Sequence, residues 1–221
     1  MLQLYNKLLE LPLFIGISTD ELSDIVEHTK FGFHKLTAGR PLVRKDEKCI
    51  QLFFLMSGIL RVISYADSHR YCIEEEMKSP SVIQPELLFG LMQHYTKDFI
   101  AQTDCSLLSL DKQEVLRLLD NHLIFRLNFL NSISMLAQRM GRIPWRRQSD
   151  GIRQQFVDFL RLRCLTQAGP KVVKIRMEDL AHELHQSRLN ISRMLNGMQH
   201  KGLLSMSRGV LTIPQLEALR D

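Results

Sequence analysis

Two arginines five residues apart could read the base edges of DNA. Arg188 and Arg193 carry planar guanidinium groups, which can donate two parallel hydrogen bonds to a guanine. If the segment between Ser187 and Gly202 forms a helix, these side chains project from its outer face together with other polar groups. The candidate DNA contacts are Ser187, Arg188, Leu189, Asn190, Ser192, Arg193, Asn196 and, from a later turn, Arg208.

The residues around this segment predict a helix, a three-residue turn and a second helix. Ser187 can cap the second helix, and Gly202 is suited to the left-handed position that ends it. His185 stands in the turn, where His tolerates a positive φ better than most residues. Apolar residues that face inward on the two helices are Leu180, Ala181, Leu184, Ile191, Leu195 and Met198.

A hairpin follows the second helix. Two short apolar runs within residues 203–213 flank Ser207-Arg208-Gly209, and an apolar β run at 172–175 precedes the helices. This order predicts a winged helix-turn-helix, a DNA-binding arrangement. The plain alternative is a helical hairpin with a solvated charged face.

The charge distribution agrees with a DNA partner for the C-terminal part. The chain has 221 residues and a net charge of +5. Residues 144–221 hold 13 Lys and Arg against 7 Asp and Glu, whereas residues 1–143 hold 16 against 17. No apolar run is long enough to cross a membrane, and the N-terminus lacks secretory features, so we expect a cytoplasmic protein. The four scattered cysteines fit reduced core thiols.

The N-terminal part shows a different pattern. Ser18 or Thr19 can cap an early helix, and short β runs with turn signals then fill residues 31–110. Many short strands at this spacing favour an antiparallel β-roll of the jelly-roll type. The predicted fold class is therefore α+β, with flanking helices, a long dimerisation helix and the C-terminal winged helix-turn-helix.

A long helix is predicted at 122–143, where Pro144 ends it. It carries two apolar stripes, of which one can pack on the roll and the other on a partner helix. We assign the dimer contact to Phe129, Ile133, Leu136 and Met140. The second stripe comprises Leu123, Leu127, Leu130 and Ala137. A helix buried entirely in its own chain is the alternative. The expected domains are 1–121, 122–143 and 144–221.

The order of roll, long helix and winged helix resembles the Crp/Fnr family of bacterial transcription factors over nearly the whole chain. The resemblance implies a homodimer on a pseudo-palindromic double-stranded operator, with RNA polymerase as a further partner. Arg188 and Arg193 match the two arginines of the family's Arg-Glu-x-x-x-Arg reading set. Leu189 replaces the Glu, so the site that is read should differ from the family's best-known consensus.

Cyclic-nucleotide-binding members of that family carry a Gly-Glu-Leu followed by an Arg-Ser or Arg-Thr pair. The corresponding residues here are Pro85-Glu86-Leu87 and Tyr95-Thr96, so Tyr95 replaces the Arg that neutralises the cyclic phosphate. Lys97 should point to the other face of its strand. We therefore expect no cyclic AMP binding, no cofactor and an unidentified effector beside Glu86, Leu87, Tyr95 and Thr96. We expect the pocket to be empty, to be filled by apolar side chains such as Leu88, Phe89 and Leu91, or to suit a less charged ligand.

Other functions remain open at this point. The winged helix could dock a protein, so that the chain is a ligand-binding or interaction module that does not act through DNA. A haem-based gas sensor of the same family could use ligands from among His34, His69, His94 and Cys72. No residue spacing indicates a metal site or a catalytic group, so we expect no enzyme. The run Glu74-Glu75-Glu76 is interpreted as a solvated strand end.

Overall fold

The computed structural model describes residues 2–145 and 151–220 and contains two compact units. The N-terminal unit holds residues 1–60 and 77–142, and the C-terminal unit holds residues 61–76 and 143–221. This grouping differs from the expected domain boundaries. The long helix belongs to the N-terminal unit, and residues 61–76 belong to the unit that contains the helix-turn-helix.

Two helices open the N-terminal unit, α1 (Leu2–Glu10) and α2 (Thr19–His28). Ser18 caps α2, since its hydroxyl accepts a hydrogen bond from the Glu21 N–H at 3.3 Å. The strands of this unit are β1 (Gly32–Leu36), β2 (Pro41–Val43), β3 (Gln51–Ser57), the start of β4 (Ile59–Tyr65), β6 (Ser81–Ile83), β7 (Lys97–Ala101) and β8 (Cys105–Asp111). The helical elements after the first strands are η1 (Pro85–Leu87), α3 (Lys112–Asn121) and α4 (Leu123–Gly141).

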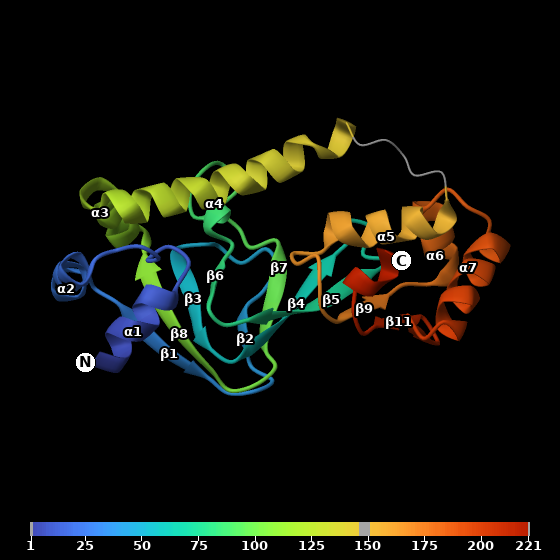
Figure 1. Cartoon of the computed structure of the whole chain (residues 1–221), viewed down its shortest axis with the longest axis horizontal. Coiled ribbons are helices and arrows are strands. Elements are labelled where there is room, and N and C mark those ends of the chain that lie inside the picture. The colour runs from blue at the N-terminus through green and yellow to red at the C-terminus, as the bar shows by residue number, and fades with distance from the viewer. Residues whose placement is uncertain (1, 146–150, 221) are drawn as a thin grey trace. The chain divides into compact units, whose positions relative to one another are not determined.

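The strands form the antiparallel roll that the sequence predicts (Figure 1). One sheet has the order β1-β8-β3-β6, and β2 pairs with β7. Phe54 in the centre of β3 faces Leu108 on one side and Val82 on the other. Its ring meets Phe14 edge-on at 5.7 Å, and Phe14 meets Phe125 of α4 at 5.2 Å. Through these ring contacts, the segment around Phe14 and helix α4 both pack on the core of the roll.

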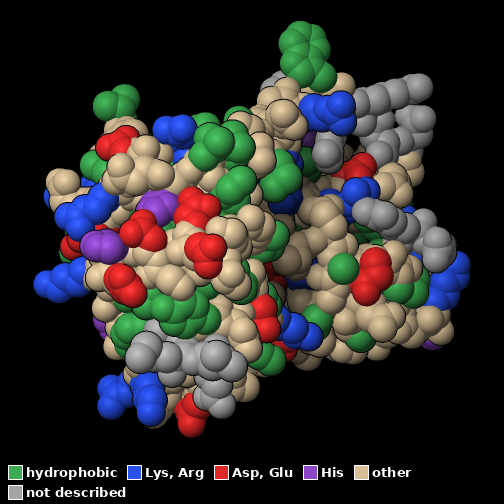
Figure 2. Space-filling model, turned by 60° about the vertical axis from the view of Figure 1, so that its left-hand side comes forward, with side chains coloured by type: hydrophobic (Ala, Val, Ile, Leu, Met, Phe, Trp, Pro, Cys, Tyr) green, Lys and Arg blue, Asp and Glu red, His purple; other side chains and the backbone are tan. Residues whose placement is uncertain are grey.

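The dimer contact predicted on α4 stays a prediction, but its residues differ in how far they are buried within the chain. Phe129 is buried in its own unit, with its ring 6.0 Å from that of Phe89, and Ile133 and Leu136 are half-buried. Only Met140 of the assigned set is well exposed. The stripe of Leu123, Leu127 and Leu130 is exposed instead. Figure 2 shows hydrophobic side chains at the surface in the upper part of the view, where α4 runs in Figure 1.

The C-terminal unit is a winged helix with an additional hairpin. Its strands run in the order β10-β11-β9-β5-β4, and Gly209 makes the wing turn with φ +73°. The elements that follow β4 and β5 (Cys72–Lys78) are η2 (Ile143–Trp145), α5 (Ile152–Arg163), β9 (Lys171–Lys174), α6 (Met177–Glu183), α7 (Arg188–His200), β10 (Ser205–Ser207), β11 (Val210–Ile213) and η3 (Glu217–Arg220).

The core of this unit joins the hairpin to the helices. Tyr71 and Ile73 of the hairpin lie in one apolar cluster with Phe156 of α5 and Leu195 of α7. The interpretation of Glu74-Glu75-Glu76 as a solvated strand end is wrong, because Glu74 and Glu75 are both buried. No helix within residues 2–145 and 151–220 combines the length and the apolar character that a membrane crossing needs.

Candidate nucleic-acid interface

The turn between α6 and α7 has the local geometry that the sequence predicts. The Ser187 hydroxyl accepts a hydrogen bond from the Asn190 N–H at 3.1 Å and so caps α7. His185 adopts a φ of +51°, and the Gln186 N–H donates to the Ala181 carbonyl at 2.9 Å. Gly202 follows the helix at φ +70°. These contacts fix the direction in which α7 leaves α6.

Helix α7 buries one side and exposes the other. Ile191, Leu195 and Met198 face the core, as predicted. The proposed DNA contacts lie at the surface except for Ser192, which is half-buried and accepts a hydrogen bond from the Asn196 amide at 3.4 Å. The exposed members are Ser187, Arg188, Leu189, Asn190, Arg193, Asn196 and, in the wing, Arg208.

A hollow of about 570 Å³ lies between the wing, α6 and α7. Three arginines from separate elements line it: Arg176, which precedes α6, Arg188 in the first turn of α7, and Arg208 at the wing turn. The Arg188 guanidinium lies 3.4 Å from the Glu178 carboxylate, and both side chains are exposed. Such an exposed ion pair holds its partners weakly, so Arg188 stays available to a nucleic acid.

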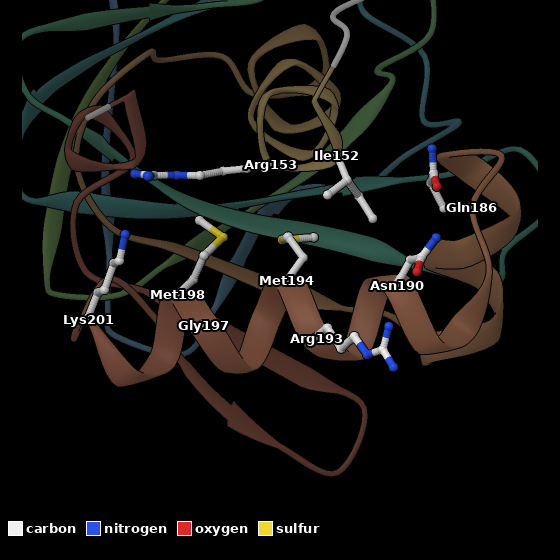
Figure 3. Close-up of a pocket in the computed structure, with 9 residues that line it drawn as sticks. All are labelled: Ile152, Arg153, Gln186, Asn190, Arg193, Met194, Gly197, Met198 and Lys201. Carbon is white, nitrogen blue, oxygen red and sulfur yellow. The ribbon is translucent and has the colours of Figure 1, made fainter.

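A second hollow of about 560 Å³ lies on the opposite flank of α7 (Figure 3). Figure 3 shows Met194 directed from α7 toward Ile152 of α5 and Met198 directed toward Arg153, whereas Arg193 extends away from them on the outer side of the helix. Lys201 lies at the end of α7, at the same rim of the hollow as Arg153. Cations therefore flank α7 on both sides.

This arrangement suits a DNA duplex. A helix with cations on both flanks can enter the major groove while the flanks neutralise phosphates on either side of that groove. Sequence reasoning missed Arg176, Arg153 and Lys201. Arg176 could have been found as a cation that stands directly before the first helix of the predicted helix-turn-helix.

Except for the exposed Thr96, the expected effector residues are more buried than most residues of the candidate interface, and the polar ones bond to other groups of the protein. Tyr95 is buried, and its hydroxyl donates a hydrogen bond to the Gln51 carbonyl at 3.2 Å. Thr96 is engaged by Gln84, whose amide nitrogen donates to Thr96 Oγ1 at 2.6 Å and whose amide oxygen accepts from the Thr96 N–H at 3.2 Å. The Tyr95 hydroxyl, the Thr96 hydroxyl and the Thr96 N–H therefore each have a hydrogen-bond partner within the protein.

Glu86 is the acidic group of this region. Burial raises the pKa of its carboxyl, and hydrogen bonds, including one with Gln84, together with the charge of Lys97 oppose this rise. The orientation of Lys97 toward the other face of its strand stays a prediction, since the action of its charge on Glu86 does not fix which way its side chain points. Leu88 is buried and Leu87 half-buried, but Leu91 is fully exposed and does not fill the region.

Two family models match successive parts of the chain. The sequence model of the cyclic nucleotide-binding domain matches residues 33–122, and that of the Crp-like helix-turn-helix domain matches residues 155–221. Together they match more than two thirds of the chain. A search of curated proteins finds no match.

Several solved structures share the fold. The catabolite activator protein of Thermus thermophilus has 18% identity and a TM-score of 0.52, over 94% of this chain and 96% of that chain. A transcriptional regulator of the Crp/Fnr family from Eubacterium rectale has 20% identity and a TM-score of 0.50, over 96% and 98%. The sensor domain of the regulator DNR from Pseudomonas aeruginosa has 19% identity and a TM-score of 0.51, over 64% and 93%.

Proposed function

Because the chain belongs to the Crp/Fnr family of DNA-binding transcription regulators, we propose that it reads a specific pseudo-palindromic operator as a homodimer. The observation that carries this proposal is the set of arginines around α7. Arg188 and Arg193 project from the exposed side of the helix, while Arg176 and Arg208 line its wing-side hollow. In this scheme the first pair reads bases and the second pair neutralises phosphates.

The exposed stripe of α4 supports the homodimer. Leu123, Leu127 and Leu130 recur at the alternating spacing of four and three residues that a two-helix contact requires, and Ser134 and Ala137 continue it. A parallel pair of α4 helices would bury these leucines around a two-fold axis. Two-fold symmetry in the protein then requires a matching symmetry in the operator.

We further propose that the effector in the roll is not a cyclic nucleotide. A cyclic phosphate carries a full negative charge, and the Tyr95 side chain is neutral and cannot compensate that charge. The Tyr95 hydroxyl already donates to the Gln51 carbonyl, and Gln84 already bonds both the hydroxyl and the backbone N–H of Thr96. Titration calorimetry with cyclic AMP and cyclic GMP should therefore give no micromolar binding. Micromolar binding of either compound contradicts this part of the proposal.

Selection from a pool of random DNA duplexes tests the DNA function. The protein should enrich a pseudo-palindrome whose half-sites lie about one helical turn, roughly 10 base pairs, apart. Arg188→Ala should lose the enrichment, whereas Arg40→Ala, which removes an exposed arginine of the N-terminal unit, should keep it. A pool that stays random with the unaltered protein would mean that the winged helix docks a protein instead.

A further inference from the structure

The hairpin at residues 61–76 completes the sheet of the winged-helix unit. Strand β5 pairs antiparallel with β9, with Cys72 opposite Lys174 and Glu75 opposite Lys171. Strand β9 in turn pairs with β11 of the wing. Without the hairpin, β9 would present an unpaired edge and its charged residues would lose their partners.

Glu75 and Lys171 form a buried ion pair between β5 and β9. Their exposed side-chain fractions are 0% and 1%, and the Lys171 Nζ lies 3.1 Å from a Glu75 carboxylate oxygen. The Glu75 carboxylate also accepts hydrogen bonds from the N–H groups of Leu165 (2.7 Å) and Thr166 (3.1 Å). Lys171 also donates to the Thr166 hydroxyl at 2.7 Å and to the Ala168 carbonyl at 3.1 Å. The pair is therefore fully hydrogen-bonded and depends on the hairpin being in place.

Further contacts connect the hairpin to α5 and α6. The Tyr71 hydroxyl donates to the Glu183 carboxylate at 3.2 Å and accepts from the Arg163 Nε at 2.8 Å. Arg70 lies 3.8 Å from Asp179 of α6. Through these contacts the hairpin helps to hold the position of α6, the helix that precedes the turn to α7.

The hairpin leaves the DNA-facing hollows open. Neither hollow beside α7 is lined by a residue of the 61–76 segment. Arg176 and Arg188 both belong to the wing-side hollow, and their relative position depends on β9 and α6, the two elements that the hairpin contacts. Seating of the hairpin is thus compatible with DNA binding and fixes the elements that present the arginines.

We propose that Glu75 is a positioning residue for DNA recognition, because its pair with Lys171 seats the hairpin that holds β9 and α6 in the DNA-binding arrangement. This inference rests on the DNA function proposed above. Both ends of the hairpin continue into strands of the N-terminal unit, at Ile59 in β4 and Lys78 in β5. A change in the roll therefore has a covalent route to the winged helix that does not pass through α4.

The variant Glu75→Gln tests the proposal, since it leaves the Lys171 charge buried without a counter-charge. If only about one molecule in ten keeps its hairpin seated, the apparent Kd for the selected operator rises about tenfold. Amide exchange in β9 should speed up at the same time. The matched control is Glu74→Gln on the same strand, whose partner Lys174 is half-exposed and can be solvated. This control should retain operator affinity within about twofold.

A disulfide clamp separates positioning from simple stability. Lys174→Cys places a thiol opposite the natural Cys72, at a separation that suits a cross-strand disulfide. In the Glu75→Gln background, oxidation should restore operator affinity and reductant should remove it again, at a temperature where circular dichroism shows both forms folded. If Glu75→Gln does not fold, the same clamp is applied to Lys171→Met, in which Glu75 keeps its bonds from Leu165 and Thr166.

Two results would overturn the inference. One is a folded Glu75→Gln protein that binds the operator like the unaltered protein, and the other is a clamp that restores stability without restoring affinity. If the unaltered protein binds no DNA, the proposed function itself fails, and this outcome is visible before any variant is made.

Discussion

The variant Leu127→Asp should dissociate the dimer by placing a carboxylate in the α4 contact. Leu123, Leu127 and Leu130 expose 55%, 44% and 52% of their surface in the single chain. Because full burial of a leucine contributes about 1.5–3 kcal/mol, covering this exposed half contributes about 1 kcal/mol per side chain. Burying an unpaired polar group costs at least about 1 kcal/mol more. Two-fold symmetry doubles both effects, so the dimer should lose about 4 kcal/mol, a roughly thousandfold rise in its Kd.

Sedimentation equilibrium over a range of concentrations measures this Kd. The matched control is Met135→Asp, which introduces the same charge on α4 at an exposed methionine about a third of a turn away from the stripe. This control should remain dimeric. If both variants dimerise as the unaltered protein does, the contact lies elsewhere and the assignment of the exposed stripe is refuted.

Two further predictions concern the wing-side hollow and the roll. Arg176→Ala should weaken operator and random DNA alike and lower the slope of log K against log salt by about 0.9, measured by fluorescence anisotropy; a loss confined to the operator would make Arg176 a base reader. Burial raises the pKa of Glu86, so the unfolded chain releases this proton at a lower pH than the folded chain. Stability should therefore fall as pH rises from the ordinary carboxyl pKa through the raised folded pKa, and Glu86→Gln should remove this fall in urea titrations. An unchanged pH profile in the variant counts against the burial argument.

The helix-turn-helix could be predicted because its determinants are local. The Ser187 cap, the positive φ at His185 and the end at Gly202 each follow from residue types within a short segment. The antiparallel roll could also be predicted from short strands and turns, because these patterns repeat along the chain. Local patterns do not state which strands pair, and so they give the class of the fold more readily than its connections.

The pairing of the hairpin strand β5 with β9 could not be predicted for that reason. Glu75 and Lys171 are separated by 96 residues, and a run of three glutamates ordinarily indicates solvent. Likewise, both stripes of α4 are apolar, so only the packing of Phe129 on Phe89 reveals which stripe remains free. The pairing of distant elements decides both cases, and a single sequence does not record it.

The discrimination of bases by Arg193 in the selected operator tests directly whether α7 reads DNA. For the unaltered protein, replacing the contacted G·C pair in each half-site should cost about 1–3 kcal/mol per half-site. Arg193→Ala should lose a similar amount on the operator and should then bind the operator and the replaced site equally. If Arg193→Ala still discriminates at every position as the unaltered protein does, α7 does not read DNA through this residue, and the account of the interface is contradicted.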